Sequence, residues 1–290
     1  MKNWSLTLVA VWISMSLAWG QDDLLEELEA SASQKENYAT AAFKGLKIVN
    51  LESTKLVADK ELNFIVSHRF GSVKNGFEDF FGLDNAVVRL QFVYGISDAI
   101  NIGISRHSFQ KIYDFTGKAR IARQGSGFPL TVVLYGAIGA NTAVEEIQPA
   151  SSFTDQLIYV AQPLISRKVN TNLSFEIAPT LFHENYVLFD SQDNTQFAIA
   201  GGARLKVSPR FALTADYGYH LNRSSDNPLK NPLSFGVDIE TGGHVFQLHF
   251  TNAQGMFESS YLGQANGDWG DGDFFFGFNL SRNFDLSKNK

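Results

Sequence analysis

Apolar residues recur at every second position along most of the chain after about residue 45. In the closing stretch 272–284, Phe274, Phe276, Phe278 and Leu280 alternate with polar or small residues, with Phe275 as the exception. This period places the apolar groups on one face of an extended strand and the polar groups on the other. Such a strand borders either the core of a soluble sandwich or the boundary between lipid and a water-filled lumen.

The same period predicts about thirteen strands. Bacterial single-chain barrels have an even number, so we expect twelve or fourteen. Either one segment is split or wrongly assigned, or residues 38–57 form two short strands, or the N-terminal segment threads the lumen. The predicted segments lie near 46–57, 61–70, 86–96, 100–109, 112–123, 129–140, 156–166, 171–183, 195–207, 210–220, 233–241, 244–252 and 273–284.

The connections between these segments alternate between two classes. Short turns, such as 97–99 and 167–170, alternate with longer polar connections, such as 141–154 and 253–272. Outer-membrane barrels are built in this way, with short periplasmic turns and long extracellular loops. Strands of about ten residues also suit a tilted crossing of a bilayer. We therefore expect an all-β fold, a closed antiparallel up-and-down transmembrane β-barrel.

In this fold the apolar face of each strand contacts lipid. Phe284, an aromatic residue close to the end of the sequence, resembles the C-terminal signal that barrel-assembly machinery recognises. The predicted lipid-facing residues are Leu90, Phe92, Ile102, Phe175, Leu213, Phe235, Leu248, Phe276, Phe278 and Leu280.

The polar face of each strand lines the lumen. Charges of both signs are present, which leaves two interpretations: a salt-bridged and largely filled lumen, or a narrow pore in which opposed charges filter solutes. The predicted lumen-lining residues are Arg69, Arg89, Gln91, Asp114, Lys118, Arg120, Glu176, Arg204, Asp216, Asp238 and His249.

Composition agrees with a barrel. The hydrophobic fraction of 44% and the charged fraction of 19% suit a protein in which half of each strand faces water. The chain has no cysteine, so neither a disulfide framework nor a lipid-anchor cysteine is expected. A net charge of −6 argues against a nucleic-acid partner.

The N-terminus predicts export. Residues 1–20 have the features of a signal peptide: Lys2, an apolar stretch over 6–17 and a small-x-small site at 18–20. We expect residues 21–43 to form a periplasmic or lumenal segment with a short amphipathic helix, and residues 44–290 to form the barrel.

No catalytic residue, metal ligand or cofactor site is expected. Residues 266–273 resemble a calcium loop, but their spacing departs from the EF-hand pattern, and a Gly/Asp turn with Trp269 at the membrane interface explains them better. No nucleophile motif stands out. The alternatives to a structural or narrow pore-forming outer-membrane barrel are a soluble secreted β-sandwich binding module and a barrel lipid hydrolase.

Several short pieces resemble a Bacteroidetes family of exported β-barrel proteins of unknown function. They are residues 67–71 (SHRFG), 94–98 (YGISD), 167–168 (RK), 178–185 and 276–282 (FGFNLSR). The resemblance implies a barrel in the outer membrane. The partners expected of such a barrel are the bilayer and, through Phe284, the barrel-assembly machinery. The resemblance brings no activity with it.

Overall fold

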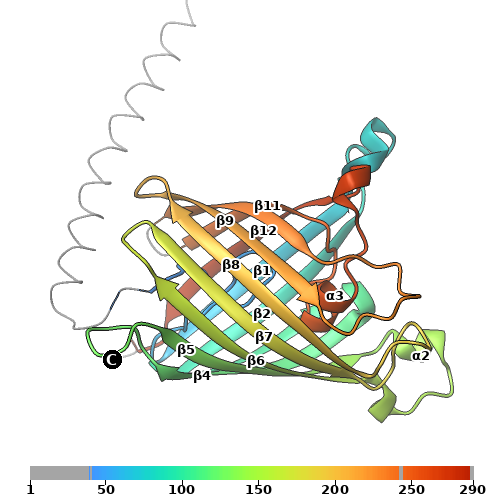
Figure 1. The fold of residues 1–290 in the computed structure, drawn as a ribbon, viewed down its shortest axis with the longest axis horizontal. Coiled ribbons are helices and arrows are strands. Elements are labelled where there is room, and N and C mark those ends of the chain that lie inside the picture. The colour runs from blue at the N-terminus through green and yellow to red at the C-terminus, as the bar shows by residue number, and fades with distance from the viewer. Residues whose placement is uncertain (1–38, 40, 242–243, 288–290) are drawn as a thin grey trace, which may run out of the picture.

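The computed structural model describes residues 39, 41–241 and 244–287. In this part of the chain twelve antiparallel strands close into one barrel (Figure 1). Each strand pairs with its neighbours in sequence, and β1 also pairs with β12, which closes the ring. The strands are β1 (Glu61–Ser72), β2 (Ala86–Ser97), β3 (Ile100–His107), β4 (Ile112–Ala122), β5 (Thr131–Asn141), β6 (Leu157–Lys168), β7 (Leu173–Glu184), β8 (Thr195–Lys206), β9 (Phe211–His220), β10 (Leu233–Thr241), β11 (His244–Thr251) and β12 (Phe275–Asp285).

The alternating pattern sets the two faces of the wall. In β7, Ser174 and Glu176 point inward and are buried, while Phe175 and Ile177 point outward and are about half exposed. This arrangement is the inverse of a soluble domain, because large apolar side chains cover the outside and polar ones fill the inside.

The described part of the chain is a single closed sheet of twelve strands. The closed up-and-down barrel is confirmed, with twelve strands. The predicted strand over 46–57 is wrong, because these residues lie inside the barrel and form no part of its wall. The alternative of a β-sandwich is also wrong, because one sheet closes on itself. The predicted signal peptide and the helix near 22–29 lie outside the described residues.

The two ends of the barrel differ as the loop lengths predict. One end, which we call the turn end, carries short turns such as the one between β2 and β3; the other, the loop end, carries the long connections (Figure 1). None of the helices in the described residues is long and apolar enough to cross a bilayer. The short helices that the described residues form lie at the loop end; they are η1 (Val73–Asp79), η2 (Phe109–Lys111), α2 (Val144–Ile147), η3 (Phe153–Gln156), α3 (Glu258–Gly263) and η4 (Trp269–Asp271).

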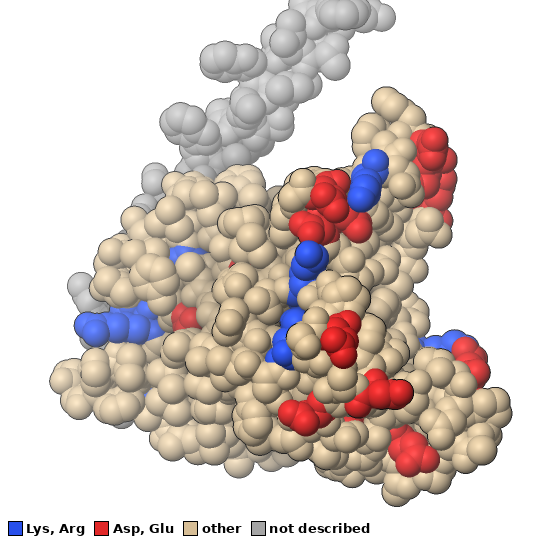
Figure 2. All heavy atoms as spheres, turned by 45° about the vertical axis from the view of Figure 1, so that its right-hand side comes forward, with Lys and Arg blue, Asp and Glu red and all other residues tan. Residues whose placement is uncertain are grey.

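Charge is distributed unevenly over the outer surface. Figure 2 shows few charged groups on the side of the barrel, whereas acidic side chains gather at the loop end. Exposed Glu78, Glu145 and Glu146 belong to these long connections. The uncharged band between the two ends has the character required of a surface in contact with hydrocarbon.

A charge placed on this band tests the assignment of the outer face. Leu90 lies near the middle of β2 and is 44% exposed, whereas Ile96 lies near the turn end and is 49% exposed. We expect Leu90→Arg to cost roughly 2–4 kcal/mol and Ile96→Arg about 0–1 kcal/mol, because the cost depends on depth in the bilayer. The measurement is the yield of folded barrel in lipid vesicles. Equal yields for the two variants would contradict the assignment.

Candidate functional site

The first described residues fold into the lumen. Residues 45–54 are buried without a break, although both ends of the segment lie at the turn end (Figure 1). Ala39 N–H donates to a carbonyl in the turn between β4 and β5 (2.9 Å), and Lys60 N–H donates to the Gly95 carbonyl (2.9 Å) as the chain enters β1. We call residues 41–57 the plug segment.

The plug segment forms a small hairpin. Ile48 N–H donates to the Leu51 carbonyl (2.8 Å), and Ser53 N–H donates to the Leu46 carbonyl (2.8 Å). Most of its other main-chain groups face the wall. A buried main-chain group without a partner is costly, so the wall has to supply the remaining hydrogen bonds.

Two wall carboxylates accept hydrogen bonds from N–H groups of the plug segment. Asp216 Oδ2 accepts from three consecutive amides, at residues 49–51, at distances of 3.1, 2.7 and 3.0 Å. Glu176 Oε2 accepts from Thr54 N–H (2.8 Å). Glu176 and Asp216 lie at one level of the barrel, since Gly202 on β8 pairs with both of them. These two carboxylates therefore form one acidic side of the site.

Wall side chains also donate to carbonyls of the plug segment. Because an amide or ammonium group carries several N–H donors, one side chain can bind more than one carbonyl. The contacts are Lys118 Nζ with carbonyls 46 (3.3 Å) and 53 (2.8 Å), Gln247 Nε2 with carbonyls 47 (3.2 Å) and 48 (2.9 Å), Asn279 Nδ2 with carbonyl 49 (3.1 Å) and Asn101 Nδ2 with carbonyl 57 (3.0 Å).

An ion network joins the plug segment to β4. Glu52 lies 2.6 Å from Lys47 Nζ in the same hairpin and 2.8 Å from Lys118 Nζ in the wall, and all three side chains are buried. Burial alone would raise the pKa of Glu52, but Lys118 and Lys47 bring it down to about 2. Burial lowers the pKa of Lys47, and Glu52 opposes that shift. Glu52 is thus held ionised by two cations.

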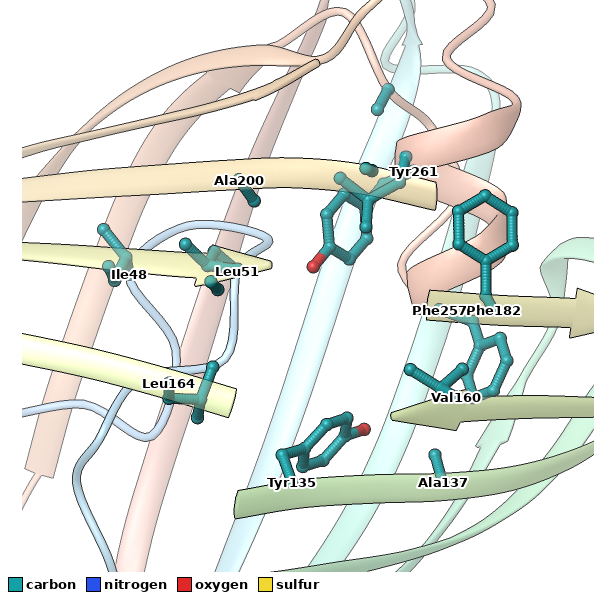
Figure 3. Packing of buried hydrophobic residues seen from close by; sticks show 14 of the residues in the cluster. Ile48, Leu51, Tyr135, Ala137, Val160, Leu164, Phe182, Ala200, Phe257 and Tyr261 are labelled. Atoms are coloured by element: carbon teal, nitrogen blue, oxygen red, sulfur yellow. The ribbon is translucent and has the colours of Figure 1, made fainter. Parts of the chain in front are cut away.

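A second segment enters the lumen from the loop end. We call residues 252–268 the inward loop; it contains α3, which is buried along its whole length. Figure 3 shows Phe257 and Tyr261 of this loop beside Phe182 and Val160 of the wall. The inward loop is therefore held largely by apolar packing, and it shares one buried cluster with the plug segment.

Charged groups of the wall meet the inward loop at Arg89. This buried side chain donates to the Met256 carbonyl (3.2 Å) and lies 3.6 Å from Asp114. Burial raises the pKa of Glu258, the first residue of α3, although Lys47 and Arg89 oppose the shift. Glu258 therefore keeps its proton to a higher pH than an exposed glutamate.

Ser105, His107 and Asp114 meet near this point, but they are not arranged as a catalytic triad. Ser105 Oγ and Asp114 Oδ2 both contact His107 Nε2, at 3.1 and 2.6 Å. In a triad the nucleophile and the carboxylate bind opposite ring nitrogens. All three side chains are also buried. The cluster is a structural hydrogen-bond network.

The two inserted segments leave little space between them. A void of about 10 Å³ lies beside Glu52, Lys118 and Tyr135, which is close to the minimum that one water molecule needs. A larger hollow of about 230 Å³ opens at the turn end beneath the plug segment, where Lys44 and Glu240 form an ion pair (3.4 Å). The plug segment and the inward loop thus occupy the lumen between the turn end and the loop end.

The structure brings most of the predicted lumen residues into contact with the inserted segments or with one another. Arg120 lies apart, at the turn end, where it donates to the Asp98 carbonyl. Asn101 and Asn279 were not predicted as site residues, because an uncharged amide on the polar face carries no distinctive signal. The residues that point inward and are buried are Arg69, Arg89, Gln91, Asp114, Lys118, Glu176, Arg204, Asp216, Asp238 and His249.

All the predicted lipid-facing residues lie on the outer face. Phe284 also lies there, with the Arg282 guanidinium 4.9 Å from its ring centre. Leu248, Phe276 and Phe278 are half-buried among their neighbours. The predicted lipid-facing residues that are more than a third exposed are Leu90, Phe92, Ile102, Phe175, Leu213, Phe235 and Leu280.

Residues 266–273, whose sequence resembles a calcium loop, contain a short helical turn that Asp268 caps. Asp268 accepts from Gly270 N–H (2.8 Å), and Trp269 stacks on Phe274 with ring centres 4.6 Å apart. Among the described residues, no group of three or more His, Asp or Glu side chains is placed to hold a metal ion.

The buried ion network yields a first prediction for the site. Because either change leaves a buried charge with fewer partners, we expect Lys118→Met and Glu52→Gln each to lower the free energy of unfolding by about 3–5 kcal/mol. The double variant should lose less than the sum, since neither partner remains alone. Guanidinium unfolding in detergent measures these changes. Lys230→Met is the control: its exposed pair with Asp268 (3.0 Å) should contribute about 0–1 kcal/mol.

The pKa of Glu52 predicts a dependence on pH. A carboxyl whose folded pKa lies near 2, below the ordinary value of 4.5, stabilises the fold above pH 4.5 and loses this effect as the pH falls towards 2. The difference in unfolding midpoint between the wild type and Glu52→Gln should be large at about pH 7 and shrink by about pH 3. A difference that stays constant over this range would contradict the ion pairing.

Comparison with known proteins places the chain among membrane barrels. No curated protein matches it. Among solved structures it resembles the NanC porin (12% identity, TM-score 0.48, 76% of this chain and 98% of that one), the KdgM porin (6%, 0.46, 77% and 99%) and Omp33 of Acinetobacter baumannii (9%, 0.46, 78% and 99%). Residues 43–284 match the family model described as "Membrane bound beta barrel domain (DUF5777)", so the chain belongs to this family and is a membrane-bound β-barrel of the outer-membrane type.

Proposed function

We propose that the protein is an outer-membrane channel for small polar solutes. The plug segment closes this channel, and withdrawal of the plug segment towards the turn end opens it. The observation that carries this proposal is the polar wall behind the plug segment, with Lys118, Glu176 and Asp216 among its groups. A barrel that only needed a permanent filling could use apolar side chains inside, as small barrels do.

The contacts of the plug segment favour reversible insertion. The wall binds its main chain through hydrogen bonds, and water can replace these bonds when the segment leaves. The segment also buries apolar side chains: Ile48 and Leu51 lie near Leu164 and Ala200 in Figure 3, and Phe43, Leu46, Val49, Leu56 and Val57 are buried as well. Withdrawal therefore exchanges polar contacts for hydration, and the lost apolar burial is the cost that keeps the closed state favoured.

The path of the chain also permits this movement. Both ends of the plug segment are at the turn end, so the segment can leave as a loop without threading through the barrel. The inward loop is anchored at the opposite end, where Arg223 donates to the Gly263 carbonyl (3.0 Å). In the open state the inward loop would stay in place and form the constriction of the channel.

A reversible cross-link tests the proposal. A Cβ atom built on Gly202 would lie 3.3 Å from Ile48 Cγ2, so Ile48→Cys and Gly202→Cys together place two thiols within reach of a disulfide. The native chain has no cysteine to compete. In planar bilayers we expect the oxidised double variant to stay closed and a reductant to restore openings, with Ile48→Cys alone insensitive to the oxidant.

Each other outcome has a distinct meaning. Openings that persist in the oxidised double variant would show that the plug segment is not the gate. A complete lack of openings in both redox states would favour a structural barrel with a permanently filled lumen.

We also infer finer points that rest on the sequence. The chain has no catalytic activity; the geometry at Ser105, His107 and Asp114 supports this. Barrel-assembly machinery recognises Phe284 at the end of β12, and residues 1–20 are removed after export. The resemblance of the short motifs favours a source in the Bacteroidetes.

A further inference from the structure

We infer that the lumen wall is a binding site for peptide main chain and that the solutes of the channel are short peptides. This inference rests on the proposed function, because the site is free for a solute only when the plug segment has withdrawn. The plug segment is then the internal occupant of a site built for peptides.

The first support is the type of group that the wall binds. In the described part of the chain, wall side chains accept from five main-chain N–H groups of the plug segment, at residues 49, 50, 51, 54 and 57, and donate to six of its carbonyls, at residues 46, 47, 48, 49, 53 and 57. Asn101 binds both the N–H and the carbonyl of Val57 with its own amide. The wall therefore matches the donors and acceptors of a peptide backbone.

The second support is that main-chain contacts outnumber side-chain contacts between the plug segment and the polar groups of the wall. The side-chain contacts join Asn50 to Arg69 (2.9 Å), Ser234 and Thr251, Glu52 to Lys118 (2.8 Å), Thr54 to Ser166 (2.6 Å) and Lys44 to Glu240 (3.4 Å). Ile48 occupies a hollow that exists because Gly202 has no side chain: a Cβ there would lie 2.3 Å from Ile48 Cδ1. Recognition through the main chain accepts many sequences, as a general peptide channel requires.

The third support is the placement of charge around the ring. Glu176 on β7 and Asp216 on β9 face Arg69 on β1 and Lys118 on β4 across the closed order of the strands. A short peptide carries an ammonium group at one end and a carboxylate at the other. The acidic side suits the ammonium end, and the basic side suits the carboxylate end.

Withdrawal of the plug segment leaves these groups in need of partners. Asp216 loses three N–H donors at once, and Lys118 loses two carbonyls together with Glu52. A peptide restores both kinds of partner at once. A neutral sugar supplies hydroxyl groups but no opposite charges, and a simple ion satisfies only one side of the lumen.

Labelling of a buried cysteine in the full chain tests the inference independently of conductance. In the variant Ile48→Cys, maleimide reaches the thiol only when the plug segment is out of the lumen. A peptide that occupies the wall competes with the plug segment, so we expect tetraalanine to raise the labelling rate. Maltotriose, a solute of similar size, should leave the rate unchanged.

Variants of the wall add a second requirement. Because the amides that replace the two carboxyl groups are weaker acceptors, Asp216→Asn with Glu176→Gln should weaken the response to tetraalanine roughly tenfold or more. The matched control is Glu184→Gln, a buried acid on the same strand as Glu176, which contacts Gln196 (2.9 Å) and Gln264 (3.1 Å) instead of the plug segment. This control should keep the full response.

The outcomes separate the two proposals. Openings in bilayers without any effect of tetraalanine on labelling, or with an equal effect of maltotriose, would overturn the peptide site and leave the channel. Faster labelling with tetraalanine but no openings would support the peptide site and overturn the channel. A thiol that is never labelled under any of these conditions would overturn both.

Discussion

The antiparallel pairing of β1 with β12 is the interaction on which the rest of the structure depends. It runs from Glu61 opposite Asp285 to Ser72 opposite Phe275, and it joins the first strand of the wall to the last. In a bilayer, an open edge would leave a row of main-chain N–H and C=O groups without water or protein partners. Closure removes that cost, and it also creates an interior that has to be filled or hydrated.

The strands turn polar side chains to the interior because their apolar side chains face outward. A strand that presents apolar groups to lipid at every second position turns its other positions inward, and here these include Arg89, Asp114, Lys118 and Glu176. Charges that have been removed from bulk water need partners. The inserted segments supply many of them: Lys118 binds Glu52 and two plug carbonyls, and Arg89 binds the Met256 carbonyl.

The two inserted segments share one apolar cluster but differ in their polar contacts. Ile48 and Leu51 of the plug segment and Phe257 and Leu262 of the inward loop are buried in this cluster. The plug segment is also bound by hydrogen bonds between wall side chains and its main chain and by one buried ion network. Hydrogen bonds to wall groups can be exchanged for water, but apolar burial is lost when a segment leaves. Withdrawal of the plug segment therefore has to offset the loss of its buried apolar side chains.

The sequence by itself determined the wall. The period of two, the alternation of short and long connections and the placement of charge on one face predicted the barrel, its two ends and the direction of residues such as Leu90 and Lys118. These are local properties, because side chains alternate along any extended strand whatever lies around it.

Only the tertiary structure decided what fills the lumen. Residues 46–57 alternate like a strand, and no local signal distinguishes them from the wall. Their burial depends on contacts such as the one between Leu51 and Asp216, which lie 165 positions apart. Which inward side chains meet depends on barrel closure and on strand register. Closure and register are both set by pairing between strands that are distant in sequence, and the sequence of one strand alone does not specify that pairing.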